Sequence, residues 1–261
     1  MRFNQAAARE SALLRGMVKP TMFVLLWRNA PGRSFADGTL CQSTHPEFAG
    51  YALKLLVTMF AAVYAMTFIA TPSLGAGWFW DIGNGIGFAA FGGLLFLTVS
   101  SGRPLNVRSH QRTGYILLFI AMAHAFWFLL GDAALSQYLK PGAPGYMWLG
   151  LFSLALLAAM ITVALPTDRQ RLYPDHSKFH YWHRLMAKST IAAATYHILA
   201  SGFYLNNGYQ KALFAGLALF ALIGRPALTR LFHPAATSPF SVLLLCIVMT
   251  LLFAAARNAP L

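Results

Sequence analysis

Four histidines lie within two long apolar stretches of the sequence, where ionisable side chains are rare and are functional candidates by default. Fourteen residues separate His110 from His124, and fourteen also separate His183 from His197. On an α-helix this separation corresponds to about 21 Å of rise and about 1400° of turn, within roughly 40° of one face. Each stretch therefore predicts a helix that presents two imidazoles along one stripe.

The chemistry that these four side chains predict is axial ligation of two haem irons. If the two helices run in the same direction, His110 lies level with His183, and His124 lies level with His197. A haem iron takes one nitrogen above its ring and one below, and side chains from facing helices converge in the core of a bundle. A single membrane histidine is more often a hydrogen-bonding core residue. Equal spacing on two helices favours ligation, because unpaired buried imidazoles carry a polar cost.

The remaining histidines fit this pattern less well. His180 lies one turn before His183 and is the one substitute ligand, although its separation of 17 residues from His197 breaks the match with the other helix. The other three fall in loops, where solvated side chains are expected: His45, His176 and His233.

Arginines gather at the end where the first histidine of each helix lies: Arg103, Arg108, Arg112 and Arg184. Haem propionates need cations, so these arginines are candidate cofactor-binding residues. The preference of basic residues for cytoplasmic loops explains them equally well.

Gly114 and Gly202 are either places where a flat ring presses on a helix or ordinary helix-packing glycines. Several aromatic side chains are expected to line the apolar interior: Phe119, Phe126, Trp127, Phe128 and Tyr196.

The composition places these residues in a membrane. Of the 261 residues, 57% are hydrophobic and 10% are charged, whereas a soluble domain has about 25% charged residues. Apolar stretches approaching the length that a span needs are 50–71, 79–100, 110–131, 146–165, 181–204, 209–224 and 239–256. We therefore predict an all-α, polytopic membrane helix bundle with seven spans, or six if the short stretch 209–224 does not cross. The histidine helices are the third and fifth spans, so they run in the same direction.

The surplus of basic residues follows these spans. Twenty Lys and Arg against seven Asp and Glu give a formal net charge of +13, concentrated before the first span and after the second, fourth and sixth. Basic loops mark the cytoplasmic side, so the N-terminus is predicted to be cytoplasmic and the C-terminus periplasmic, and nucleic-acid binding is not needed to explain the charge. Residues 1–33 are expected to form either a basic interfacial helix or a solvated tail. The sequence has two cysteines, Cys41 and Cys246, too few for a disulfide framework, a four-cysteine zinc site or an iron–sulfur cluster.

Two motifs then resemble a known family. His110-Gln-Arg-Thr-Gly114 followed by His124, and Trp182-His183-Arg184-Leu185 followed by His197, are similar to the ferric reductase-like transmembrane domain family. That family includes the membrane parts of ferric reductases and NADPH oxidases. It also includes the haem-binding membrane subunit of the bacterial methionine sulfoxide reductase system, whose short, all-membrane form this chain resembles.

The resemblance covers about residues 50–205 and implies two b-type haems in a bacterial inner membrane. By motif position, His110 and His183 would hold the inner haem, and His124 and His197 the outer one. The chain then divides into a basic N-terminal segment (1–48), a haem-binding transmembrane core (49–205) and two further transmembrane helices (206–261).

Full-length reductases of that family carry a cytoplasmic flavin- and nicotinamide-binding module after their membrane helices. This sequence shows no phosphate-cradling glycine loop after a predicted strand, and Gly83-Asn-Gly85-Ile-Gly87 is better interpreted as helix packing. We therefore expect the haem-binding subunit of an oxidoreductase, without an NAD(P)H- or flavin-binding domain of its own.

The leading hypothesis is electron transfer across the membrane between a separate donor and acceptor. A flavoprotein or quinol would reduce one haem, and a cytochrome, periplasmic oxidoreductase or small acceptor would oxidise the other, so any flavin or quinone comes from a partner or the pool. The alternative is a haem-containing reductase that acts directly on ferric iron or oxygen at the outer face. A third class is a non-redox transporter or assembly anchor, but proton relays recruit membrane acids, and only Asp81 and Asp132 lie near spans, both at outer ends. Membrane lipid surrounds the chain in each case.

Overall fold

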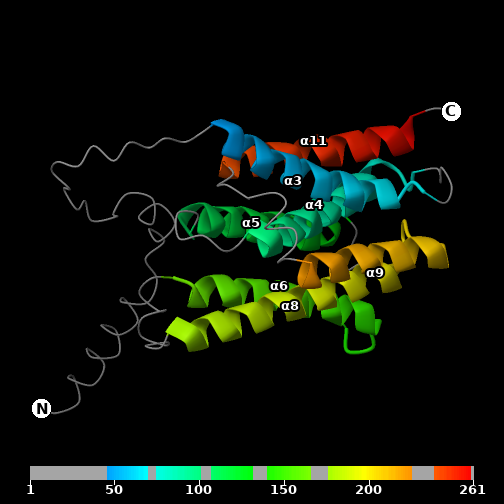
Figure 1. The fold of residues 1–261 in the computed structure, drawn as a ribbon. Helices are drawn as coiled ribbons and strands as arrows, with labels where there is room; N and C mark the ends of the chain where they lie inside the picture. Colours follow the sequence, from blue (N-terminus) through cyan, green and yellow to red (C-terminus); the bar gives the residue numbers. More distant parts are fainter. Residues whose placement is uncertain are drawn as a thin grey trace, which may run out of the picture. The chain divides into compact units, whose positions relative to one another are not determined.

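The computed structural model describes residues 46–69, 75–100, 107–131, 140–165, 176–224 and 238–259, all within one compact unit that begins at Thr44. Regular secondary structure in these ranges is entirely helical. The helices are α3 (Pro46–Met66), α4 (Trp78–Ser100), α5 (Val107–Gly131), α6 (Gly145–Val163), α8 (His176–Ser201), α9 (Gly208–Ile223) and α11 (Pro239–Asn258) (Figure 1). Each covers most of one predicted apolar stretch, so the prediction of an all-helical chain is confirmed for the described residues. Residues 1–33, predicted to be a basic helix or tail, lie outside them.

Four of these helices are long and apolar enough to cross a membrane: Trp78–Val99, Val107–Leu129, Gly145–Val163 and Pro239–Asn258. Shorter apolar segments are Ala52–Met66 in α3 and Gly208–Ile223, which is α9. Large apolar side chains remain exposed along the helices, as at Leu251 and Leu252 of α11. An α-helix satisfies its backbone polar groups internally, which the interior of a bilayer requires. These features indicate an integral membrane protein whose exposed apolar faces contact lipid.

α4 is the central helix and packs against α3, α5, α9 and α11. Its glycines allow this close packing. A Cβ atom at Gly85 would lie 3.0 Å from the side chain of Thr250 on α11, and one at Gly92 would lie 3.3 Å from Phe60 on α3. Because small residues let helix backbones approach in membranes, the interpretation of the glycine-rich stretch as helix packing is confirmed at Gly85.

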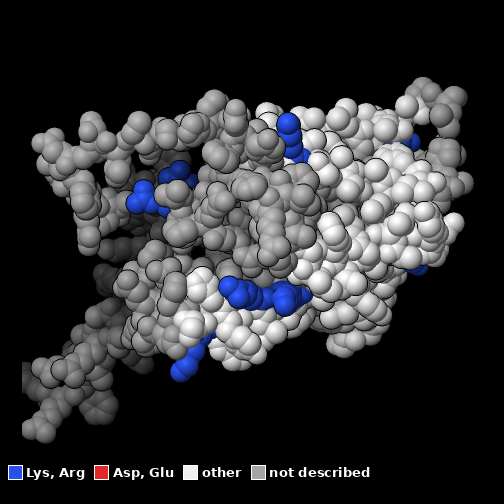
Figure 2. Space-filling model, viewed as in Figure 1, with Lys and Arg blue, Asp and Glu red and all other residues white. Residues whose placement is uncertain are grey.

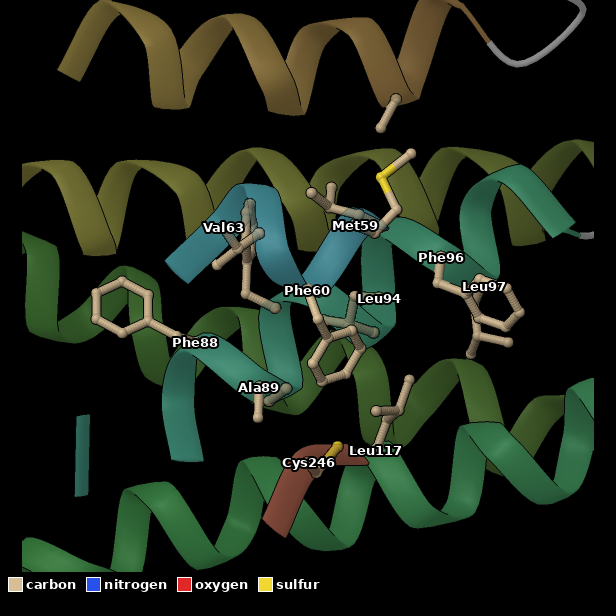
Figure 3. Close-up of a cluster of buried hydrophobic side chains, with 14 of the residues drawn as sticks. Met59, Phe60, Val63, Phe88, Ala89, Leu94, Phe96, Leu97, Leu117 and Cys246 are labelled. Atoms are coloured by element: carbon tan, nitrogen blue, oxygen red, sulfur yellow. The ribbon is translucent and has the colours of Figure 1, made fainter. Parts of the chain in front are cut away.

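The hydrophobic core lies around α4. Figure 3 shows side chains of α3, α4, α5 and α11 converging there, among them Phe60, Val63, Leu94, Leu117 and Cys246. Phe60 and Leu117 are completely buried, and Cys246 is nearly so. Dense packing of this kind fixes the position of α5, which carries two of the four candidate histidines.

α8 lies along α6, and α9 lies beside α8 while also packing against α4 and α3 (Figure 1). The Ser153 hydroxyl of α6 donates a hydrogen bond of 3.0 Å to the carbonyl of Thr190 on α8. α8 ends where Gly202 adopts φ +66°, a left-handed conformation that favours glycine. A Cβ atom at Gly202 would meet nothing within 4 Å, so Gly202 does not serve close helix packing, the second of the two roles expected for it.

A buried polar network ties the start of α4 to the end of α11. Asp81, in the first turn of α4, is completely buried and accepts hydrogen bonds from the Tyr204 hydroxyl at 2.6 Å and from Asn258 Nδ2 at 2.7 Å. Arg257 of α11 donates to the carbonyl of Thr67 at 2.7 Å, and its guanidinium lies 4.5 Å from the Tyr204 ring centroid. The sequence shows Asp81 at the end of an apolar stretch, but it does not predict that the protein buries this carboxylate.

Candidate functional site

The structure brings together the histidines that the sequence predicts to pair. The ring centroids of His110 on α5 and His183 on α8 lie 6.2 Å apart, and we refer to these two residues as the 110/183 pair. The ring centroids of His124 and His197 lie 6.4 Å apart and form the 124/197 pair. α5 packs mainly on α4 and α8 mainly on α6, so each pair joins a helix that packs on α4 to a helix that packs on α6.

Both separations suit one metal ion held between two imidazoles. A metal–nitrogen bond to histidine is about 2.0 Å long and the nitrogen lies about 1.2 Å from its ring centre, so a linear arrangement places the ring centres about 6.4 Å apart. The measured distances of 6.2 and 6.4 Å agree with this value. The ring planes meet at 60° and 75°, which is compatible because linear ligation does not fix the angle between the two ring planes.

The number of ligands distinguishes a bare ion from a prosthetic group. Among the residues that the structure describes, no three or more His, Cys, Asp or Glu side chains gather as a metal site. A protein-bound transition metal ion such as zinc normally takes three or four protein ligands. Two facing imidazoles instead fit an iron whose other four positions are filled by a macrocycle. The residues present therefore fit haem.

Hydrogen bonds define the ring orientation in the 124/197 pair. His124 Nδ1 lies 2.8 Å from the carbonyl oxygen of Gly83 on α4, and His197 Nδ1 lies 2.8 Å from the carbonyl oxygen of Tyr146 on α6. A carbonyl oxygen only accepts hydrogen bonds, so each Nδ1 carries the proton. Each Nε2 then keeps its lone pair, which is the form of imidazole that ligates a metal.

The 110/183 pair borders a cavity of about 440 Å³. Gly114 lines this cavity, and a Cβ atom there would lie 4.0 Å from its nearest neighbour, Ile161. The ring of Phe179 stacks on that of His183, with centroids 5.4 Å apart and planes 28° from parallel. The other lining residues are mostly apolar and come from five helices, including Leu94, Leu97, Leu157, Met160, Ile191 and Leu222.

The predicted arginines are only partly brought to this cavity. Arg184 lines it together with Lys188 and Gln111, and both basic side chains are largely exposed and therefore lie at its rim. Arg108 and Arg112 are exposed on α5 and are not among the lining residues. Arg103 lies outside the described residues. In the view of Figure 2 the basic side chains form separate small groups rather than one continuous patch.

Other predicted residues have different positions. His180 is exposed and contacts Phe179, and His183 is the residue that faces His110. Phe119, Phe126 and Tyr196 are 50 to 68% exposed, so the expectation that they line the interior is wrong for these three. Trp127 and Phe128 do pack against other residues. Trp127 stacks on Phe79, and the ring centroids of Phe128 and His124 lie 5.6 Å apart. His45, His233 and Asp132 lie outside the described residues, as does the side chain of His176.

Sequence reasoning missed three parts of the site: Lys188, Phe179 and the two backbone carbonyls. Lys188 follows Arg184 by four residues, a spacing that places both on one helix face and that would have revealed it. Phe179 precedes His183 by the same spacing. The carbonyls of Gly83 and Tyr146 have no side-chain signal, because every residue carries a carbonyl group.

Fold and site together define a class: a helical membrane protein in which two facing helices bring four histidines together as two pairs. Comparison of the chain with protein-family models, with curated proteins and with solved structures finds no match. The function is therefore argued from the site itself.

Proposed function

We propose that the chain is a transmembrane electron-transfer protein that holds two bis-histidine b-type haems, one at the 110/183 pair and one at the 124/197 pair. The observation that carries this proposal is the pairing of four equally spaced histidines across α5 and α8, with ring centroids 6.2 and 6.4 Å apart. The resemblance of the two histidine motifs to the ferric reductase-like transmembrane domain family points to the same cofactor and the same activity.

The proposal includes seven membrane spans, with the N-terminus in the cytoplasm and the C-terminus outside a bacterial inner membrane. Support for α8 and α9 as spans comes from the alternation of basic loops, which requires a crossing at each of them. With this orientation the 110/183 pair is the inner one and the 124/197 pair the outer one. A reporter fused after residue 261 is expected to be active outside, and one fused near residue 170 inside. A cytoplasmic C-terminus would mean that α9 does not cross.

Each part of the site has a defined task. The four histidines would hold the haem irons through their ring nitrogens, and the carbonyls of Gly83 and Tyr146 hold two of the rings in the required tautomer. The apolar walls of the cavity exclude water, and Arg184 and Lys188 supply positive charge at its rim for the acidic edge of the cofactor. A bound haem supplies one-electron chemistry. With imidazoles on both faces of the iron, direct binding of oxygen there is disfavoured.

The donor and acceptor are separate molecules in this proposal. Nicotinamide cofactors deliver two electrons as a hydride, whereas a bis-histidine haem accepts one, so a flavin or an equivalent group must divide the pair. A flavoprotein or quinol is the proposed donor, and a cytochrome or periplasmic oxidoreductase the proposed acceptor. The basic residues near the 110/183 pair would make docking of an acidic donor dependent on ionic strength.

The absorption spectrum of the purified chain tests the proposal. We expect a Soret band, b-type bands on reduction and two haems per chain. Dithionite should reduce both haems, whereas NADPH alone should reduce neither. A preparation from haem-supplemented cells that lacks a Soret band would contradict the haem assignment, and rapid reduction by NADPH would reveal a nucleotide site on this chain.

A further inference from the structure

The two rings of the 124/197 pair contact their neighbouring helices through the same local pattern. His124 Nδ1 bonds to the carbonyl of Gly83, and the residue four positions later on α4 is Gly87. His197 Nδ1 bonds to the carbonyl of Tyr146, and the residue four positions later on α6 is Gly150. The pattern therefore occurs twice, on different helices and with different sequences around it.

Each glycine lies directly against the ring. A Cβ atom at Gly87 would lie 2.7 Å from His124 Cε1 and 2.8 Å from its Nδ1. A Cβ atom at Gly150 would lie 2.8 Å from His197 Nδ1 and 3.0 Å from its Cε1. Real Cβ atoms essentially never approach heavy atoms that closely, and here the obstacle is a ring held between helices rather than the end of a flexible chain.

Helix geometry explains why the glycine stands four residues after the carbonyl. In an α-helix the carbonyl of residue i accepts from the N–H of residue i+4, and a second lone pair remains. The side chain at i+4 lies beside that second lone pair, and at Gly87 and Gly150 a Cβ atom would occupy the space that the imidazole ring fills. Glycine destabilises a helix interior relative to alanine, so its presence at both positions calls for such a reason.

We propose that Gly87 and Gly150 are positioning residues that open one carbonyl on α4 and one on α6 to the imidazoles of the 124/197 pair. Each carbonyl fixes the Nδ1–H tautomer and aims Nε2 at a common iron. By accepting a hydrogen bond from Nδ1–H, it also makes the imidazole a stronger electron donor. A stronger donor stabilises ferric over ferrous iron and lowers the reduction potential of that site. The identity of the metal rests on the proposed function, whereas the tautomer and the role of the glycines do not.

The chain offers two matched controls. Gly85 lies on α4 between Gly83 and Gly87, but its Cβ position faces Thr250 and Phe253 of α11 rather than a histidine. Gly216 lies on α9, where a Cβ atom would meet nothing within 4 Å. Gly85→Ala thus tests tight helix packing without a ring, and Gly216→Ala tests the helix effect of the substitution alone.

Nitrogen-15 NMR of the dithionite-reduced protein in lipid tests the geometry with or without bound haem. We expect protonated, hydrogen-bonded Nδ1 at His124 and His197, with resonances assigned by their loss in His124→Gln and His197→Gln. Gly87→Ala should shift only the His124 signal and Gly150→Ala only the His197 signal, while both control variants leave them in place. An unprotonated Nδ1 at either ring of the unaltered protein would overturn the proposal, whether or not the variants fold.

Redox titration gives the second readout, which a merely structural role would not move. In Gly87→Ala and in Gly150→Ala the potential of one haem should rise, by on the order of tenfold in the ferric–ferrous equilibrium, which is about 59 mV for one electron. The other haem and both control variants should keep their potentials. Unchanged potentials in both glycine variants, with two haems bound, would overturn the effect on the iron. Absence of haem from the unaltered protein would instead remove the proposed function, and the NMR result would still decide the positioning role.

Discussion

The two histidine pairs lie on the same two helices and have almost the same separation of ring centroids, yet their surroundings differ. At the 124/197 pair each ring bonds to a backbone carbonyl and lies against a glycine of α4 or α6. At the 110/183 pair the rings border a cavity of about 440 Å³, with Phe179 stacked on His183 and basic side chains at the rim. Ligand spacing along α5 and α8 sets where the sites lie, and the neighbouring helices set how each site is held.

This difference has a physical consequence for each pair. A backbone carbonyl moves only with its helix, and α4 is fixed by its packed core and by the buried network around Asp81, two residues before Gly83. The 124/197 rings therefore have a fixed environment. The 110/183 pair has space beside it and charge at the edge of that space, which suits the site to accept a bulky group with an acidic edge.

The largest expected effect comes from removing the histidines of one pair. His124→Ala or His197→Ala should abolish one of the two haems and leave the other in place, because the pairs are separated by about 21 Å along each helix. His110→Ala or His183→Ala should give the reciprocal loss. Pyridine haemochrome analysis measures the ratio of haem to protein in each variant. His180→Ala is the control, since His180 is exposed and should leave both haems bound. Two haems retained in every variant would remove these four residues from the ligand set.

The next effect concerns the frame of the 124/197 pair. Asp81→Ala leaves the Tyr204 hydroxyl and the Asn258 amide without their buried acceptor, and we expect it to lower the free energy of unfolding by about 3 kcal/mol. Thermal unfolding in detergent measures this change, with exposed Lys178→Ala as the control. Because Gly83 follows Asp81 in the same helix turn, the haem at the 124/197 pair should be lost at a lower temperature than the other. Simultaneous loss of both haems at an unchanged temperature would contradict the link between the network and that pair.

Sequence patterns predicted the helices and the pairing of the histidines because both depend on properties of the backbone. An α-helix advances by a constant rise and turn per residue, so fourteen residues place His110 and His124, and likewise His183 and His197, on one face. The apolar stretches predicted the positions of the helices, because a helix that crosses a membrane needs about 20 mainly apolar residues.

The residues that face each histidine ring could not be predicted from the sequence in the same way. Gly87 and Gly150 face the histidines only because of the angles at which α4 and α6 cross α5 and α8, and these angles depend on side-chain packing along whole helices. The enclosure of Asp81 was equally hidden, because its partners Tyr204 and Asn258 are 123 and 177 residues away in the sequence.

A smaller effect is expected from filling the cavity beside the 110/183 pair. Gly114→Leu places a branched side chain in that cavity, and we expect haem affinity at this pair to fall about tenfold, the loss typical of altered support around a metal site, while the other pair is unaffected. Gly114→Ala should have little effect, because its Cβ would lie 4.0 Å from Ile161. Haem titration of the depleted protein measures both affinities. Equal losses at the two pairs in Gly114→Leu would show that the cavity does not belong to one pair alone.

The smallest effect is expected at the rim of the same cavity. Arg184→Gln and Lys188→Gln remove positive charge near His183, and positive charge stabilises the reduced, less positive iron. The potential of the haem at the 110/183 pair should therefore fall in each variant, by less than about 59 mV, because both side chains are exposed and water weakens their interaction.

Redox titration at two salt concentrations measures the shift, which should shrink at high salt, as exposed charges are screened there. The potential of the haem at the 124/197 pair should stay constant, because the two pairs are about 21 Å apart along each helix. Arg112→Gln is the matched control: Arg112 is exposed on α5 and does not line the cavity, so a shift as large as that of Arg184→Gln would show that the surface charge as a whole, rather than the rim, sets the potential.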